Sequence, residues 1–131
     1  MIIHNNREEP PYHTDLGLTF NELRAVNVQR CQSGFGHALS SWSVAEWGNA
    51  AAGELGEACN IAKKMLRFRD GIAGNQPGKT RADYCRDLAT EIAGALIYLD
   101  LWAASEGLNL GEIVRAEFNK KSAEIGSDIK L

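Results

Sequence analysis

The sequence of 131 residues has little of what marks several large classes of protein. Its three cysteines, Cys31, Cys59 and Cys85, are far apart and form neither a CxxC pair nor a zinc-ligand pattern with the three histidines. Scattered cysteines in odd number favour reduced thiols in a cytoplasmic protein over a disulfide framework. The longest apolar stretch is about ten residues, whereas a membrane-spanning helix needs about 20. The sequence therefore predicts a cytoplasmic chain that does not cross a membrane.

Clustered positive charge is also missing. The chain has 14 Lys and Arg against 17 Asp and Glu, a net charge of −3, and no basic block. Because a groove for polymeric nucleic acid is lined by clustered Lys and Arg, this composition argues against such a groove. A single nucleotide needs only a few cations and stays compatible. The N-terminal stretch MIIHNNREEPPYH has no long apolar segment, so no secretory signal is expected there.

Helix-start signals are what the sequence has in abundance. In a capping box, a small polar side chain and an acid three residues later satisfy each other's free backbone N–H groups. Four such pairs occur: Thr19 with Glu22, Ser43 with Glu46, Thr80 with Asp83, and Asn109 with Glu112. Each precedes a segment of helical periodicity, and glycines follow each segment. These signals predict helices at 19–34, 44–68, 81–106 and 110–125.

No segment alternates in the manner of a strand, and no repeat or low-complexity tract is present. The sequence thus predicts an all-α protein with an N-terminal arm at 1–18, which contains Pro10 and Pro11, and a single helical domain at 19–131. Four such helices favour an antiparallel four-helix bundle. The second and third helices are apolar over more than one stripe, which predicts a homodimer or homotetramer.

Acidic residues interrupt the apolar faces of these two central helices. At about 100° per residue, Glu54 lies within the stripe of the second helix and Glu57 at its edge. On the third helix, Glu91 lies among apolar residues and Asp87 precedes it by one turn, whereas Asp100 is expected to face solvent. A buried carboxylate is costly unless a partner compensates it.

A divalent cation held between the two helices would compensate such acids, and carboxylates from facing helices form metal sites in bundle cores. An all-oxygen ligand set favours Mg²⁺, or Mn²⁺, over zinc. The alternative is a set of ion pairs, such as Glu57 with Lys64. The loop AGNQPGKT at 73–80 nearly spells a phosphate-binding motif, but it lacks the first glycine and the preceding strand. A plain connection is expected, although a lid that carries Lys79 to a phosphate remains open.

Three motifs resemble one family. AAGELGEACNIAKK (51–64), LATEIAGALIYLDLWAA (88–104) and EFNKKSAEIGSDI (117–129) are similar to those of the MazG-like all-α nucleoside triphosphate pyrophosphohydrolases, which are related to the dimeric dUTPases. The resemblance implies hydrolysis of a nucleoside triphosphate to the monophosphate and pyrophosphate with Mg²⁺.

Carried over by position, the resemblance assigns catalytic and metal-binding roles to Glu54, Glu57 and Glu91. Helix geometry adds Asp87, one turn before Glu91, as a further candidate ligand, although one turn is about 5.4 Å along the axis. It places substrate contacts at Tyr98, Asn119 and Lys121. Geometry adds Lys64 as a phosphate partner, because it shares the glutamate face, and Trp47 as a base-stacking candidate whose alternative is a place in the core.

One position departs from the family pattern. The pattern expects an acid at 94, where this chain has Gly94. Water could complete a Mg²⁺ site there, and an acid restored at 94 is expected to raise the rate or metal affinity. The departure keeps two alternatives open: a nucleotide- and metal-binding protein with weak or no turnover, and a structural oligomeric bundle.

Overall fold

The computed structural model describes residues 17–131, and all of the described regular structure is helical. Helix α1 spans Phe20–Gln29 and continues as a π-helical turn at Arg30–Gly34, and a short 3-10 turn follows at Leu39–Ser41. The longest helices are α2 at Val44–Asp70 and α3 at Arg81–Ser105, and α4 spans Leu110–Glu124. The all-α class and the four helices are confirmed. The predicted arm at 1–18 lies, but for its last two residues, outside the described part.

The predicted caps explain where the helices begin. Thr19, Ser43 and Thr80 each accept a hydrogen bond from the backbone of the acid three residues on, and that acid bonds back. Asn109 accepts from the backbone N–H of Glu112. Helix α2 ends at Gly71, whose φ of 66° is left-handed and readily adopted by glycine. Local sequence chemistry therefore set these boundaries.

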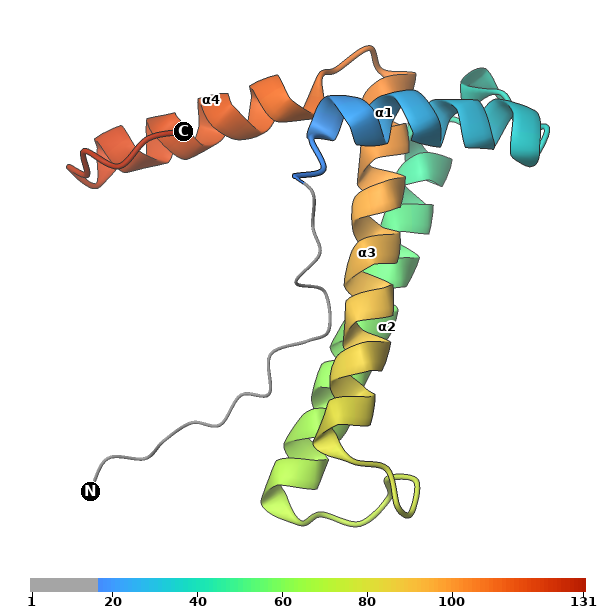
Figure 1. The fold of residues 1–131 in the computed structure, drawn as a ribbon, viewed down its shortest axis with the longest axis vertical. Coiled ribbons are helices and arrows are strands. Elements are labelled where there is room, and N and C mark those ends of the chain that lie inside the picture. The colour runs from blue at the N-terminus through green and yellow to red at the C-terminus, as the bar shows by residue number, and fades with distance from the viewer. Residues whose placement is uncertain (1–16) are drawn as a thin grey trace.

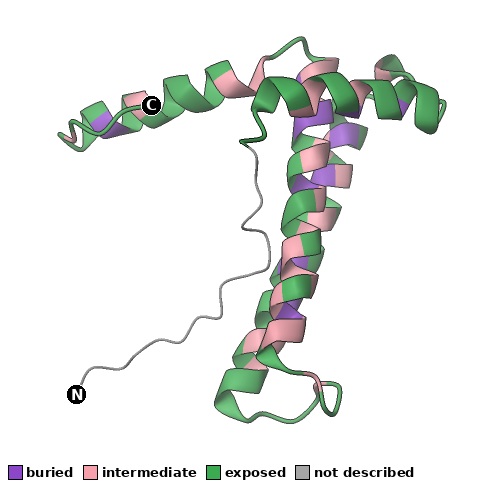
Figure 2. Cartoon of the chain, in the orientation of Figure 1, coloured by how far each residue is buried: buried purple, intermediate pink, exposed green. Residues whose placement is uncertain are grey.

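Helices α2 and α3 pack side by side as an antiparallel pair, and α1 crosses one end of that pair (Figure 1). The main buried cluster lies at this crossing, where Cys31, Trp47 and Leu101 meet. Elsewhere along the pair, much of the surface is exposed (Figure 2). The crossing end is thus the best-packed part of the chain.

The crossing of α1 over α3 is held by a buried polar network, and it corrects one prediction. Asp100 was expected to face solvent, but its side chain is 0% exposed. Its carboxylate accepts hydrogen bonds from Arg24 Nε at 2.8 Å and from Asn27 Nδ2 at 3.0 Å. Asn27 Nδ2 also donates to the backbone oxygen of Ile97. The prediction was wrong because α1 covers the face of α3 that lies away from α2.

Helix α4 stands away from the α2/α3 pair (Figure 1). Two hydrogen bonds connect the N-terminal end of α4 to α1. Asn109 donates to Asn21 at 3.3 Å, and Arg24 donates to the backbone oxygen of Leu108 at 2.8 Å. The C-terminal segment folds back along it, because the Asn119 side chain bonds both the backbone N–H and the oxygen of Leu131. Bundle packing is therefore shown for α2 and α3, and α4 does not close a four-helix bundle within one chain.

Helix α3 is strongly apolar, and one of its apolar faces is exposed in the single chain. By length and composition alone, with a mean hydropathy of 1.2 over 18 residues, it could cross a membrane, a test that core helices of soluble proteins also pass. Ile92, Leu96 and Leu99 are 55%, 40% and 42% exposed, and their spacing puts them on one side of the helix. This apolar stripe bears on assembly below.

Candidate functional site

Two of the predicted acids, Glu54 of α2 and Glu91 of α3, lie close enough to interact between the two helices. The Glu54 side chain reaches across to α3 at Gly94: a Cβ built on that glycine would lie 2.6 Å from Glu54 Oε2 and 3.0 Å from its Cδ. Glu54 and Glu91 are half-buried, and Glu57 is exposed. The helix pair therefore brings Glu54 to the backbone of α3 one turn beyond Glu91.

The electrostatics of Glu91 show that these acids act on one another. Its pKa is raised, first by partial removal from water, then by a hydrogen bond with Glu54 and by the negative charges of Glu54, Glu57 and Asp87. Like charges nearby disfavour the ionised form of a carboxyl group. Three of the predicted acids thus surround the fourth closely enough to change its proton affinity.

Asp87 already has a cationic partner. Lys79, from the loop that joins α2 to α3, forms an ion pair with Asp87 and lies over the Tyr84 ring at 5.0 Å from its centroid. The hydrogen bond to Asp87 is the main cause of a raised Lys79 pKa. The same loop is tied to α2 by Asn75, which donates to the backbone oxygen of Lys64 at 2.7 Å. The loop therefore spans the two helices beside the acids.

The carboxylates of these acids do not converge on a single metal-binding position in the structure. Within residues 17–131, no group of three or more His, Cys, Asp and Glu side chains is placed to hold a metal ion. Their chemistry nevertheless suits a hard divalent cation, because carboxylate oxygens are the ligands that Mg²⁺ and Mn²⁺ prefer. Glu54, Glu57 and Glu91 are the residues that could hold it.

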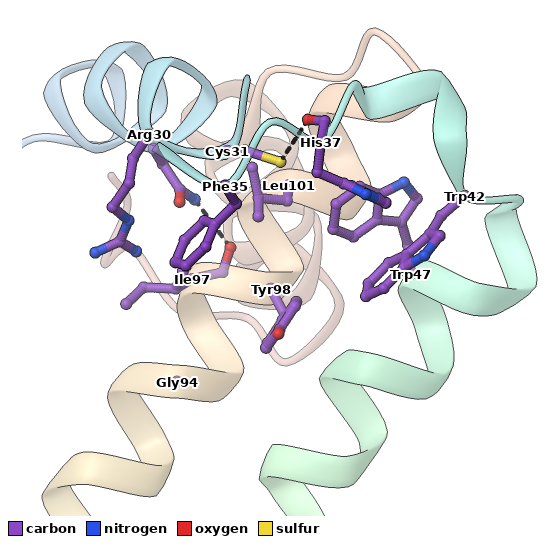
Figure 3. Close-up of a pocket in the computed structure, with 11 residues that line it drawn as sticks. Arg30, Cys31, Phe35, His37, Trp42, Trp47, Gly94, Ile97, Tyr98 and Leu101 are labelled. Atoms are coloured by element: carbon purple, nitrogen blue, oxygen red, sulfur yellow. Dashed lines mark hydrogen bonds between the residues drawn. The ribbon is translucent and has the colours of Figure 1, made fainter. Parts of the chain in front are cut away.

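A cavity of about 430 Å³ opens beside the acids, between α1, α3 and the segment that leads into α2 (Figure 3). Its lining is mainly aromatic and aliphatic, with a few polar groups at the α1 side. The lining residues are Asn27, Arg30, Cys31, Phe35, His37, Trp42, Trp47, Gly94, Ile97, Tyr98 and Leu101. Volume and lining are those of a small-molecule pocket.

Aromatic rings packed edge to face form the wall of this cavity next to α2. Trp47 is 1% exposed and its Nε1 donates to the backbone oxygen of Leu39 at 3.0 Å. The Trp42 ring lies edge-on to Trp47 at 4.6 Å between centroids and to His37 at 4.7 Å. His37 Nε2 is buried without a hydrogen-bond partner. The wall is therefore mainly aromatic and contains one buried polar atom without a hydrogen-bond partner.

Gly94 connects the cavity with the acids. It lines the cavity on α3, and the Glu54 carboxylate lies against the same residue. Tyr98, one turn further along α3, also lines the cavity and lies 6.5 Å from the Trp47 ring between centroids. An occupant of the cavity would thus have the carboxylates at one end.

The other predicted substrate contacts fall in different places. Trp47 lies in the core and lines the cavity. Lys64 is half-buried on α2, three turns beyond Glu54. Asn119 and Lys121 lie on α4, where Asn119 bonds Leu131 and Lys121 pairs with Glu124 at 3.1 Å. A single chain therefore does not bring the α4 residues to the acids.

Sequence reasoning missed most of the cavity lining. Phe35, His37 and Trp42 lie between α1 and α2, where no helical period indicates which side chains turn inward. Their one signal was the concentration of aromatic and histidine side chains in the short stretch FGHALSSW.

Comparison of this chain with protein-family models, with curated proteins and with solved structures finds no match.

Proposed function

We propose that the protein is a Mg²⁺-dependent nucleoside triphosphate pyrophosphohydrolase, which converts an NTP or dNTP to the monophosphate and pyrophosphate. One observation carries the proposal: an aromatic-lined cavity of about 430 Å³ ends at Gly94, against which the Glu54 carboxylate lies. A nucleotide needs these two environments side by side, an apolar place for the base and a charged place for the phosphates.

The cavity suits the nucleoside half of such a substrate. Aromatic rings bind bases by stacking, which is worth about 1–3 kcal/mol per base. Trp42 and Tyr98 offer rings at the cavity surface, and His37 Nε2 offers a polar atom without a partner. A base among these rings would leave its phosphates toward Glu54, because the cavity ends there.

The acids suit the phosphate half together with a cation. In this proposal Glu54, Glu57 and Glu91 hold Mg²⁺ or Mn²⁺, with Asp87 available once Lys79 leaves it. The ion supplies neutralisation of the phosphate charge. The raised pKa of Glu91 supports this role, because partial removal from water and then the neighbouring carboxylates disfavour its ionised form, and a bound cation would favour it. Lys64, on the same helix, would offset charge that develops on the phosphates.

Assembly as a homodimer or homotetramer belongs to the same proposal. The stripe of Ile92, Leu96 and Leu99 on α3 is exposed, and α4 stands clear of the helix pair. A second copy could cover both faces, and so close the bundle that one chain leaves open. It could also bring Asn119 and Lys121 to an acidic site.

Pyrophosphate release from a panel of NTPs and dNTPs with Mg²⁺ tests the activity. Glu54→Gln keeps the size of the side chain and removes its charge, so release is expected to fall by roughly 100-fold or more. Glu106→Gln, an exposed acid at the end of α3, is the matched control and should keep the wild-type rate. Unchanged release by Glu54→Gln, or no release by the wild type, would count against the enzyme.

A second candidate is a nucleotide-binding protein without turnover. The observation that favours it is the lack of three converging ligands among the described residues, with Glu54 turned to Gly94. If no pyrophosphate is released, thermal stabilisation by a nucleotide that requires Mg²⁺ would support the binder over a purely structural bundle.

A further inference from the structure

The place where the resemblance expects a fourth acid is filled by a side chain from the other helix. A Cβ at position 94 would meet Glu54 Oε2 at 2.6 Å, Cδ at 3.0 Å and Cγ at 3.5 Å. Atoms of these types do not approach a real Cβ to 2.6 Å, so any residue but glycine at 94 would move Glu54. In the structure the Glu54 carboxylate lies in this space.

Glycine at position 94 is expected to lower the stability of helix α3. It is the one glycine among the 25 residues of α3, and glycine within a helix weakens it relative to alanine. Its φ is not positive, so the backbone there does not call for glycine. The carboxylate end of the Glu54 side chain, from the facing helix, lies where a methyl group would be, so a larger residue at 94 would shift that carboxylate without having to move the backbone.

We propose that Gly94 is a positioning residue, which seats the Glu54 carboxylate against α3, beside Glu91 and at the end of the cavity. The inference rests on the proposed function and deepens it. Glu54 takes the space of the expected acid, so the site works with Glu54, Glu57 and Glu91, and an acid added at 94 displaces a ligand instead of supplying one.

Gly94→Ala is the central test, because it separates helix stability from the position of Glu54. Alanine is the better helix former, so the thermal unfolding temperature of the metal-free protein is expected to stay level or rise. Mn²⁺ affinity, measured by titration calorimetry with the metal alone, is expected to fall roughly 10- to 100-fold, the loss typical when a residue that positions a metal ligand is changed. Pyrophosphate release should fall with it.

Two controls match the change. Gly56→Ala makes the same substitution on α2, where a Cβ meets nothing within 4 Å, so it should stabilise the helix and leave Mn²⁺ binding alone. Ala93→Asp adds a carboxylate one residue away at an exposed position. It should bind Mn²⁺ as the wild type does, whereas Gly94→Asp should bind it more weakly.

Rescue provides a readout that a merely structural role would not move. Glu54→Asp withdraws the carboxylate by one methylene group, so Gly94→Ala combined with Glu54→Asp is expected to bind Mn²⁺ more tightly than Gly94→Ala alone. Wild-type Mn²⁺ affinity in Gly94→Ala, a gain in Gly94→Asp, or no Mn²⁺ binding by the wild type would each overturn the inference. Mn²⁺ binding that Gly94→Ala abolishes, without pyrophosphate release by the wild type, would support the inference and reject the enzyme.

Discussion

The Arg24 guanidinium on α1 holds the fully buried carboxylate of Asp100 on α3, with Nε 2.8 Å from Oδ1. Asn27 donates to the other carboxylate oxygen at 3.0 Å. Asn27 also lines the cavity, so this network fixes the cavity wall as well as the crossing of two helices. The buried Asp100 carboxylate depends on its hydrogen bonds to Arg24 and Asn27, because water cannot reach it to replace them.

Replacing Asp100 by alanine should destabilise the fold strongly. The change leaves the Arg24 charge and the Asn27 amide without their partner, and removal of one member of a buried pair typically costs about 3–5 kcal/mol. Chemical denaturation of the purified variant measures the loss. Asp83→Ala offers no clean comparison because Asp83 caps α3, so the control is Arg86→Ala.

Arg86 forms a surface pair with Asp83 three residues earlier, and its loss should cost no more than about 1 kcal/mol. Equal losses for Asp100→Ala and Arg86→Ala would show that the buried network contributes nothing beyond a surface pair.

The raised pKa of Glu91 predicts how stability depends on pH. In the unfolded chain this carboxyl titrates near its ordinary value of about 4.3, and in the folded protein it titrates higher. Between the two values the folded protein binds more protons, so the free energy of unfolding falls as the pH rises through this window. The contribution is fully present below the ordinary pKa and lost above the raised one.

Glu91→Gln removes this titration and the repulsion from Glu54, Glu57 and Asp87. The metal-free variant is therefore expected to unfold at a higher temperature than the wild type at pH 7, and the difference should vanish on acidification below about pH 4. Differential scanning calorimetry across pH measures it. Comparison with the wild type matters, since Glu46 and Asp83 have lowered pKa values and weaken the fold on acidification in both proteins. A variant that is less stable at pH 7 would reject the repulsion.

The boundaries of the helices could be predicted from the sequence, because each start depends on contacts within a few residues. Thr19, Ser43 and Thr80 cap as expected. The orientation of Asp100 could not be predicted, since helical periodicity reports one apolar face and does not say that α1 covers a second. On the side of α3 that was predicted to face solvent, Asp100 accepts a hydrogen bond from Arg24, which is 76 residues away in the sequence.

The candidate site shows the same division. Periodicity put Glu54 and Glu91 on facing sides of two helices, and their mutual effect on the Glu91 pKa agrees with that placement. The resemblance, and not periodicity, led to the expectation of an acid where Gly94 stands. It could not reveal that Glu54 fills the space, because that depends on how closely α2 and α3 approach. Phe35, His37 and Trp42 escaped prediction because the segment between α1 and α2 has no helical period.

Trp42→Ala should weaken nucleotide binding and leave metal binding unchanged. Trp42 lies at the cavity wall, 4.6 Å from Trp47 between ring centroids, whereas the carboxylates lie beyond Gly94. Loss of a stacking surface typically costs about 1–3 kcal/mol per base, so the dissociation constant for a nucleotide should rise about 5- to 150-fold. Titration calorimetry with a nucleotide, and separately with Mn²⁺, gives both constants.

Phe68→Ala is the control for Trp42→Ala, because Phe68 is an aromatic residue near the far end of α2 and does not line the cavity. It should bind nucleotide as the wild type does. If Trp42→Ala bound nucleotide with wild-type affinity, the base would not lie in this cavity.

Leu96→Glu should dissociate the assembly without unfolding the chain. In one chain Leu96 is 40% exposed between Ile92 and Leu99, so a charge there meets water and costs little. In an oligomer that covers this stripe, the same charge would be buried without a partner, which costs several kcal/mol. Sedimentation velocity should show a wild-type dimer or tetramer and a smaller species for Leu96→Glu, with helicity unchanged by circular dichroism.

The control is Asn49→Glu, an exposed position near the start of α2, which should sediment as the wild type does. If assembly also completes the site by bringing α4 of a second copy to the acids, Leu96→Glu will lose pyrophosphate release together with its oligomeric state. Full release by a dissociated Leu96→Glu chain would instead place every required group within one copy, and it would leave Asn119 and Lys121 without a part in the reaction.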